Sequence, residues 1–206
     1  MFISIDGGDG CGKSTQVSLL TEWLRQQNHE VFTCRDPGST ALGEAVRGIL
    51  LNRHDLEICR MSEMLLFMAA RAQMVQESIA PALKSGKIVV SDRFLLSTIV
   101  YQGYAGKIAV GDIETIGRIA TAGVLPGLGF VLDVSLETAE VRMQSRKMDR
   151  MEQMGPDYHE QVRQGFLAHA KTDPQRFVVL DASLPVDVLA VRIREIVAER
   201  LQIKSQ

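Results

Sequence analysis

The apolar run Phe2-Ile3-Ser4-Ile5 is followed almost at once by Gly7-Gly8-Asp9-Gly10-Cys11-Gly12-Lys13-Ser14-Thr15. The second stretch fits the phosphate-loop pattern, in which two glycines separated by four residues precede a lysine and a serine. The apolar run predicts a short buried strand. After the loop, apolar residues recur at helical spacing, at Val17, Leu20, Trp23 and Leu24. A strand, a glycine-rich turn and a helix N-terminus direct backbone N–H groups and the positive end of the helix dipole toward one point. We therefore expect this stretch to bind a nucleoside triphosphate.

The loop residues have separate predicted tasks. Gly7 and Gly12 allow backbone angles that are closed to other residues, and they leave room for a phosphate because they have no Cβ. Lys13 is expected to reach the outer phosphates, and Ser14 to ligate Mg²⁺. A glycine-rich turn formed by chance is the alternative. Cys11 fits as a small residue, with an oxidation-sensitive thiol as the alternative. The residues predicted to contact the nucleotide are Gly7, Gly8, Asp9, Gly10, Cys11, Gly12, Lys13, Ser14 and Thr15.

The composition predicts one cytoplasmic domain over residues 1–206. Hydrophobic content of 46% and charged content of 23% are ordinary for a globular protein. The net charge of −2 gives no basic field for a nucleic-acid polymer or an anionic membrane. The sequence has no stretch of about 20 apolar residues that could span a membrane, and we expect no signal peptide before the first predicted strand. The three cysteines are expected to be reduced, and the histidines show no metal-ligand spacing.

Hydrophobic periodicity predicts strands that alternate with helices along the whole chain. The expected strands are 2–5, 31–34, 88–93, 129–134 and 177–181. Two of the expected helices after the first begin near residues 41 and 95, and the others span 62–84, 111–123, 137–145, 157–171 and 186–201. Thr40 is positioned to cap the helix that follows it. Such alternation implies a parallel sheet covered on both faces by right-handed crossovers. We expect a three-layer α/β sandwich with a five-stranded parallel sheet.

Phosphate loops serve kinases, GTPases, ATPases and ligases, so other residues must decide between these classes. A GTPase needs an Asn-Lys-x-Asp segment to read guanine, and the sequence has none. A motor or remodelling ATPase usually needs a longer chain. Asp92-Arg93 stands at a predicted strand tip beside the loop. There Asp92 could help to hold Mg²⁺, and Arg93 could bind a transferring phosphoryl group. A surface ion pair is the alternative.

Two further spacings favour a small-molecule kinase. Arg142, Arg146 and Arg150 are four apart around a polar segment at 146–156, as in a lid whose arginines stabilise a phosphoryl group when it closes. A solvated basic helix face is the alternative. Phe67 and Arg71, one helical turn apart, could stack on a base and bond its edge. A core phenylalanine with a surface arginine is the alternative.

Four segments carry a more specific pattern, in the order of the chain. They are residues 7–15, Arg35-Asp36-Pro37-Gly38-Ser39-Thr40, Ala69-Ala70-Arg71-Ala72-Gln73, and Asp92-Arg93-Phe94-Leu95-Leu96-Ser97-Thr98 with Tyr101-Gln102-Gly103. Together they resemble the bacterial thymidylate kinase family. The phosphate loop alone is shared with many families, but the combination is specific. The resemblance implies the fold of P-loop nucleoside monophosphate kinases. It also implies transfer of the ATP γ-phosphate to dTMP with Mg²⁺, which gives dTDP and ADP and serves dTTP synthesis.

The resemblance also implies roles for individual side chains. Asp9 matches an acidic residue near the dTMP sugar and phosphate, where a carboxylate could bond the 3′-hydroxyl. Phe67 matches the ring that stacks on thymine, and Arg71 the side chain that reads the base edge. Arg47 and Arg93 match residues that hold the monophosphate or the phosphoryl in transit. The wall near the base and deoxyribose matches Ser97, Thr98, Tyr101 and Gln102, with Tyr101 crowding a 2′-hydroxyl.

Members of this family carry the catalytic arginine either in the phosphate loop or in the lid. Position 10 is glycine here, so the arginine is predicted to come from a lid at about 146–157, with Arg142, Arg146 and Arg150 as candidates. Lys13 and Arg93 would act with it.

Ser39 departs from the family pattern, which usually has a second glycine there, and Phe94 stands where His or Tyr is frequent. The lid is one residue shorter than expected, and a homodimer through the long helix is implied.

Two rival functions stay open at this level. A kinase for another nucleotide or nucleoside would stack a different base on Phe67. A nucleotide-gated switch or binding protein with slow ATPase activity would bind ATP without monophosphate-dependent turnover.

Overall fold

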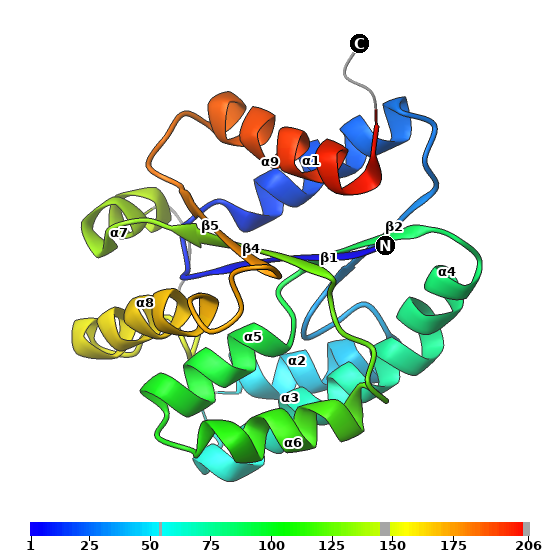
Figure 1. Cartoon of the computed structure of the whole chain (residues 1–206). Helices are drawn as coiled ribbons and strands as arrows, with labels where there is room; N and C mark the ends of the chain where they lie inside the picture. Colours follow the sequence, from blue (N-terminus) through cyan, green and yellow to red (C-terminus); the bar gives the residue numbers. More distant parts are fainter. Residues whose placement is uncertain (54, 145–148, 204–206) are drawn as a thin grey trace.

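The computed structural model describes residues 1–53, 55–144 and 149–203. Its centre is a parallel sheet in the order β2-β3-β1-β4-β5 (Figure 1). The strands are β1 (Phe2–Gly7), β2 (Val31–Arg35), β3 (Ile88–Asp92), β4 (Leu128–Asp133) and β5 (Phe177–Asp181). All neighbouring pairs are parallel, so the carboxyl ends of the strands meet at one edge of the sheet. The predicted three-layer α/β sandwich is confirmed.

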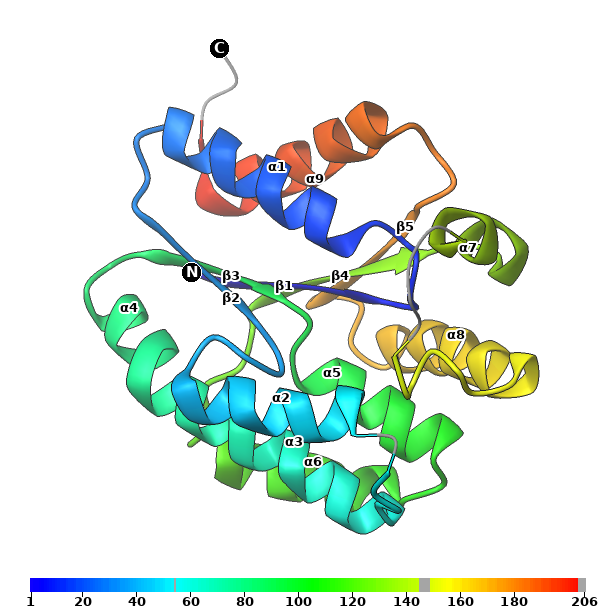
Figure 2. The same cartoon turned by 180° about the vertical axis from the view of Figure 1, so that it is seen from behind.

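Helices cover the sheet on both faces, as Figures 1 and 2 show from opposite sides. On one face α1 (Lys13–Gln26) packs beside α9 (Val186–Leu201). The other face carries α2 (Ala41–Asn52), α3 (Arg60–Met74), α4 (Ala80–Lys84), α5 (Leu95–Thr98), α6 (Val110–Ala120) and α8 (Pro156–Ala170). Because both faces are covered, the central strand β1 is buried along its whole length.

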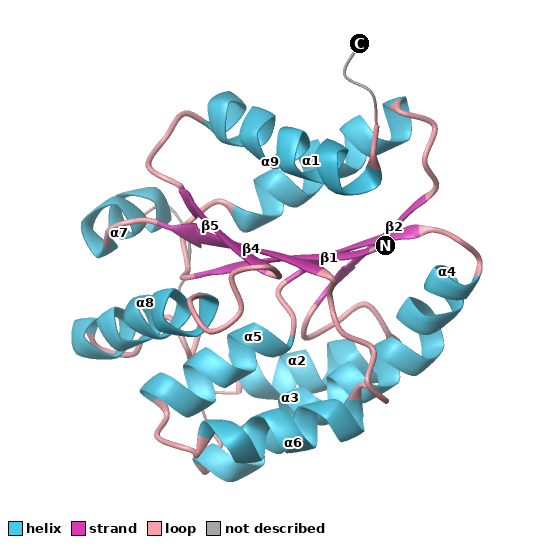
Figure 3. Cartoon of the chain, viewed as in Figure 1, coloured by secondary structure: helices cyan, strands magenta, loops and turns pink. Residues whose placement is uncertain are grey.

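Two helices predicted as single α-helices contain π-helical turns. The stretch expected at 62–84 consists of α3, the π-helical η1 (Val75–Ile79) and α4. Pro81 lies in the first turn of α4 and has no N–H to continue the α-helical ladder, which accounts for the change of hydrogen bonding just before it. The second stretch begins as α5 and continues as η2 (Ile99–Ala105). Figure 3 shows both as continuous helical paths beneath the sheet.

The remaining boundaries lie close to the predicted ones. Thr40 caps α2 as expected, with its Oγ1 accepting from the Gly43 N–H at 2.9 Å. Helix α7 (Leu136–Met143) follows β4. The lid was predicted at about 146–157, but α8 already begins at Pro156, where proline is favourable at a helix start. Residues 145–148, including Arg146, lie outside the described residues.

Candidate active site

The phosphate loop joins β1 to α1 at the carboxyl edge of the sheet, as predicted. Gly12 has φ +92° and immediately precedes α1, whose first residue is Lys13. The buried Lys13 side chain folds back over the loop. Its Nζ donates to the carbonyl oxygens of Gly8 at 2.6 Å and Gly7 at 3.3 Å, and the Cys11 Sγ lies 3.6 Å away. The ammonium is therefore held beside the helix N-terminus, which itself attracts phosphate.

Two oxygen-bearing side chains meet next to this loop. Ser14 Oγ donates to Asp92 Oδ2 at 2.6 Å. Asp92 is the last residue of β3 and is buried. A hydroxyl and a carboxylate are oxygen ligands of the kind that Mg²⁺ accepts. The predicted metal ligands are thus adjacent, and their chemistry fits the ion.

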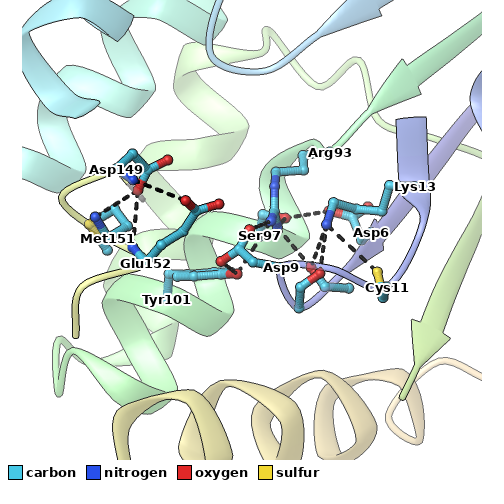
Figure 4. A network of polar contacts seen from close by, with 12 residues as sticks. Asp6, Asp9, Cys11, Lys13, Arg93, Ser97, Tyr101, Asp149, Met151 and Glu152 are labelled. Carbon is cyan, nitrogen blue, oxygen red and sulfur yellow. Dashed lines mark hydrogen bonds and ion pairs between the residues drawn. The ribbon is translucent and has the colours of Figure 1, made fainter. Parts of the chain in front are cut away.

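Asp9, Arg93 and Tyr101 form a polar network across the loop (Figure 4). Arg93 donates to Asp9 Oδ1 at 2.5 Å, and the Tyr101 hydroxyl donates to Asp9 Oδ2 at 2.9 Å. The Arg93 guanidinium also lies over the Tyr101 ring, 5.1 Å from its centroid. Burial raises the pKa of Asp9, but the charges of Arg93 and Lys13 and the Tyr101 hydrogen bond outweigh it, so the pKa lies below its usual value. Asp9 is therefore a carboxylate at neutral pH.

The backbone of Arg93 is in the left-handed region, with φ +66°. This conformation costs energy for a residue with a Cβ, and such residues cluster at functional sites. It is held by the Arg93 N–H, which donates to the Ile5 oxygen at 3.0 Å, and by the Ser91 hydroxyl, which donates to the Arg93 oxygen at 2.6 Å. The side chain then extends back over the loop to the Gly7 oxygen at 2.8 Å.

Arg71 is 1% exposed, so the alternative of a surface arginine is wrong. Its Nε donates to Asp36 Oδ2 at 2.5 Å, and its terminal nitrogens donate to Thr98 Oγ1 at 2.7 Å and to the Met68 sulfur at 3.1 Å. Phe67, one turn earlier on α3, is only partly buried. Both side chains line the same cavity.

The other predicted wall residues also line this cavity, and each has a partner. Arg47 donates to the Pro37 oxygen at 3.0 Å. Ser97 donates to Asp6 Oδ1 at 2.7 Å, and Gln102 donates through Nε2 to Glu63 Oε1 at 2.9 Å.

Sequence reasoning missed three buried acids that hold these residues: Asp6, Asp36 and Glu63. Asp6 lies near the carboxyl end of β1, and Asp36 directly follows β2. A signal for these two was available, since sites in parallel sheets form outside the carboxyl ends of the strands. Glu63 lies in the first turn of α3, where an acidic residue needs no functional explanation.

Of the candidate arginines, Arg142 and Arg150 lie within the described residues, and they have different surroundings. Arg142 donates to the Ala182 oxygen at 3.0 Å and lines the cavity. Arg150 contacts Glu63 and the Leu50 oxygen instead, and the described cavity lining does not include it.

Acidic lid residues, which were not predicted, do line the cavity. Asp149 Oδ1 accepts from the backbone N–H groups of Met151 and Glu152 at 2.8 and 3.0 Å, and Glu152 Oε2 accepts from the Asp149 N–H at 3.0 Å. In Figure 4 this turn lies beyond Tyr101 from the phosphate loop.

The position of α7 explains why residue 10 of the loop is a glycine. It has φ +75°, and a Cβ there would lie 2.7 Å from the Ala139 oxygen of α7. An arginine at position 10 would therefore collide with α7.

Two of the departures from the family pattern, Ser39 and Phe94, are accommodated locally. Ser39 adopts φ +64°, as a glycine readily would, and is exposed. Its N–H donates to Glu44 Oε1 at 2.8 Å. Phe94 is buried and packs edge-on against Phe2, with ring centroids 4.9 Å apart.

One cavity of about 600 Å³ is lined by most of these groups, whereas Arg150 and Glu63 are not part of its described lining. The phosphate loop follows the central strand β1. The segment after β2 contributes Asp36 and Pro37 on one side of it, and the segment after β5 contributes Ala182 and Leu184 on the other.

A family model described as thymidylate kinase matches residues 5–193 of the chain. This chain belongs to the thymidylate kinase family. The thymidylate kinase of Caldanaerobacter subterraneus subsp. tengcongensis is 44% identical over 190 residues, which cover 92% of this chain and 90% of that protein. The thymidylate kinase of Thermoanaerobacter sp. (strain X514) is 43% identical over 180 residues, or 87% and 88% of the two chains. A crystal structure of thymidylate kinase from Ehrlichia chaffeensis matches with a TM-score of 0.78 at 32% identity, covering 96% of this chain and 98% of that one.

The thymidylate kinase family confirms the predicted class of enzyme. The chain is an ATP-dependent nucleoside monophosphate kinase that phosphorylates dTMP. Within the described ranges, no helix combines the length and apolar character that a bilayer crossing requires.

Proposed function

We propose that dTMP and ATP bind at opposite ends of the cavity and that the γ-phosphoryl group passes directly between them beside the phosphate loop. The order of the strands in the sheet is the observation that supports this proposal. The loop after β1 lies between the segment that follows β2 and the segment that follows β5. The first segment adjoins Phe67 and Arg71, which suit a base and its edge. The second adjoins Arg142 and apolar side chains of α9, which suit the donor nucleotide.

At the acceptor end, Phe67 stacks on thymine and Arg71 bonds the base edge. Arg71 uses three of its five N–H donors within the protein, so two remain for the base. Asp9 accepts from the 3′-hydroxyl, and Tyr101, fixed against Asp9, excludes a 2′-hydroxyl. Ser97, Thr98 and Gln102 complete the wall, and Arg47 and Arg93 hold the monophosphate.

At the donor end, residues 7–15 bind the phosphates of ATP. Lys13 and Arg93 stabilise the charge on the transferring phosphoryl group, together with an arginine of the lid at about 146–157. Among Arg142, Arg146 and Arg150, the contacts of Arg142 favour a position beside the donor nucleotide. Phosphoryl transfer depends mainly on positioning and charge stabilisation, so no general base is assigned.

Ser14 and Asp92 would hold Mg²⁺. The hydroxyl and the carboxylate already touch at the edge of the phosphate loop. When bound there, the ion would supply positive charge to the phosphate oxygens, while Asp92 keeps Ser14 oriented.

We further propose that residues 1–206 act as one cytoplasmic kinase domain that forms a homodimer through α3. Three methionines of this helix, Met61, Met64 and Met68, lie three or four residues apart and share one face. Met64 and Met68 belong to the core, whereas Met61 and Leu65 are each 47% exposed. Two exposed apolar side chains one turn apart suit a second copy of the chain. Sedimentation of Leu65→Glu tests this, with a monomer as the expected result.

The reaction is tested by ADP release from ATP and Mg²⁺ with dTMP, dUMP, UMP, CMP, AMP, GMP and thymidine offered separately. We expect strong turnover with dTMP, weaker turnover with dUMP and none with the ribonucleotides. Preference for another acceptor would overturn the roles of Phe67, Arg71 and Tyr101. ATP binding without acceptor-dependent turnover would indicate a binding protein.

A further inference from the structure

Glu63 joins two parts of the site without lining the cavity itself. It is 7% exposed in α3, and its two carboxylate oxygens have different partners. Oε1 accepts from Gln102 Nε2 at 2.9 Å, and Oε2 accepts from the guanidinium of Arg150. One carboxylate therefore connects η2, which carries the acceptor wall, to the lid.

The first contact fixes the orientation of the Gln102 amide. A glutamine side chain presents either an acceptor oxygen or a donor NH₂ group, whereas a carboxylate only accepts. Glu63 therefore requires Nε2 of Gln102 to face it. The oxygen Oε1 is then the part of the amide that is left for a ligand in the cavity that Gln102 lines.

An acceptor at this point distinguishes pyrimidine bases. Thymine and uracil carry a hydrogen on N3 and can donate to Oε1. Cytosine has a bare lone pair on N3, which would face the Gln102 oxygen without a proton between them. A buried polar contact left unpaired in this way costs binding free energy.

The second contact anchors the lid. Arg150 donates through Nε to the Leu50 oxygen at 2.8 Å, and its backbone N–H donates to the Leu51 oxygen at 3.2 Å. The Arg150 side chain thus docks on the C-terminal end of α2, and Glu63 neutralises its charge there.

We propose that Glu63 is a positioning residue that sets the base preference of the acceptor pocket through Gln102 and ties this pocket to the lid through Arg150. The inference rests on the proposed binding of dTMP beside Gln102. It assigns to Glu63 a role in specificity although the residue touches no substrate.

The variant Glu63→Gln tests the proposal, because its amide can donate as well as accept and so permits Gln102 to turn over. We expect the KM for dTMP to rise about tenfold, the loss of roughly one hydrogen bond. The ratio of kcat/KM for dTMP over dCMP should fall by a similar factor. The KM for ATP should stay within about twofold.

A matched control is available on the same helical run. Gln73 Nε2 donates to Glu77 Oε2 at 2.8 Å, but this pair is exposed. Glu77→Gln should leave both the KM for dTMP and the dTMP-to-dCMP ratio unchanged.

A double-mutant cycle separates positioning from a general structural role. In a Gln102→Ala background the amide is absent, so Glu63→Gln should add little to the rise in KM. If the two substitutions raise the KM for dTMP by factors that multiply, the proposal is overturned. It is also overturned if Glu63→Gln keeps the wild-type ratio of kcat/KM for dTMP over dCMP. If Glu63→Gln does not fold, Glu63→Asp keeps the charge but withdraws the carboxylate from Gln102, and an unchanged ratio there would overturn it equally. Absence of dTMP turnover in the wild type would instead contradict the proposed function.

Discussion

Ser14, the second residue of α1, donates a hydrogen bond of 2.6 Å to Asp92, the last residue of β3, across 78 positions of the chain. This contact ties the phosphate loop to a neighbouring strand. It places a hydroxyl and a carboxylate together at the one edge where the strand ends converge.

Replacement of Asp92 by asparagine is expected to weaken the use of Mg²⁺. The amide keeps the shape of the side chain but loses the charge, so the Mg²⁺ concentration for half-maximal turnover should rise about tenfold to a hundredfold. Asp181→Asn is the control, since Asp181 also ends a strand but is exposed and accepts from Ser183. An unchanged Mg²⁺ dependence in Asp92→Asn would remove this residue from the metal site.

Lys13→Ala should reduce dTMP-dependent turnover by about a hundredfold or more, because it removes a fixed positive charge from the transferring phosphoryl group. Steady-state ADP release measures the effect. Lys87→Ala, which removes a lysine that is 40% exposed at its side chain and paired with Glu30, should leave the rate unchanged. A near wild-type rate in Lys13→Ala would refute the mechanism.

Gly10→Ala should destabilise the protein more than Gly12→Ala. Both residues have positive φ, so each alanine carries backbone strain of about 1–2 kcal/mol. At Gly10 the new Cβ also meets the Ala139 oxygen at 2.7 Å, whereas at Gly12 it meets nothing within 4 Å. Overpacking should add about 1–3 kcal/mol at Gly10 alone. Urea unfolding without nucleotide measures the free energy of unfolding of both variants. Equal losses in the two would show that α7 moves to make room for the new methyl group at position 10.

Arg71→Met should lower the free energy of unfolding by about 3–5 kcal/mol, because it leaves the Asp36 carboxylate buried without its cation. Both side chains of this pair are 1% exposed. In Arg163→Met the lost partner is Asp133, and that pair is partly solvated, with side chains 31% and 22% exposed. The cost there should be about 1 kcal/mol or less. Similar losses in the two variants at pH 7 would contradict this account of Arg71.

His169 should make stability decrease in mild acid. Burial lowers the pKa of this histidine below 6.5 and outweighs the nearby Glu114 carboxylate. Below pH 6.5 the unfolded chain therefore takes up a proton that the folded protein does not, and the free energy of unfolding falls. His169→Phe keeps the edge-on ring contacts with Tyr104 and Phe177 but cannot titrate. Between pH 7.5 and 5.5 the wild type should lose up to about 1.4 kcal/mol more than the variant in urea unfolding. Equal losses of unfolding free energy in the wild type and in His169→Phe would mean that His169 takes up a proton as readily in the folded protein as in the unfolded chain.

The sequence was informative where chemistry and position are local. The phosphate loop lies between a strand and a helix that its own neighbours predict, and Asp92-Arg93 ends an apolar strand. The pairing of Arg71 with Asp36 could not be read in this way. It depends on how the segment after β2 packs against α3, 35 positions further along the chain.

The lid shows the same limit. The regular spacing of four residues gives no way to distinguish Arg142 from Arg150. In the structure, however, Arg142 contacts the segment after β5 and Arg150 contacts Glu63 on α3.

The π-helical turns were also not predicted, because an apolar pattern over so few residues does not distinguish 3.6 residues per turn from a slightly wider helix. Pro81 was the one visible signal.

The π-helical stretch η2 makes chain length a determinant of the acceptor pocket. A π-helical turn closes hydrogen bonds over five residues where an α-helix uses four, and so accommodates one residue more. Deletion of a single residue within 99–105 would restore regular α-helical hydrogen bonding. It would also change the directions in which the side chains within this stretch point relative to Ser97 and Thr98. Deletion of one residue could therefore change the shape of the acceptor pocket without introducing any new side chain.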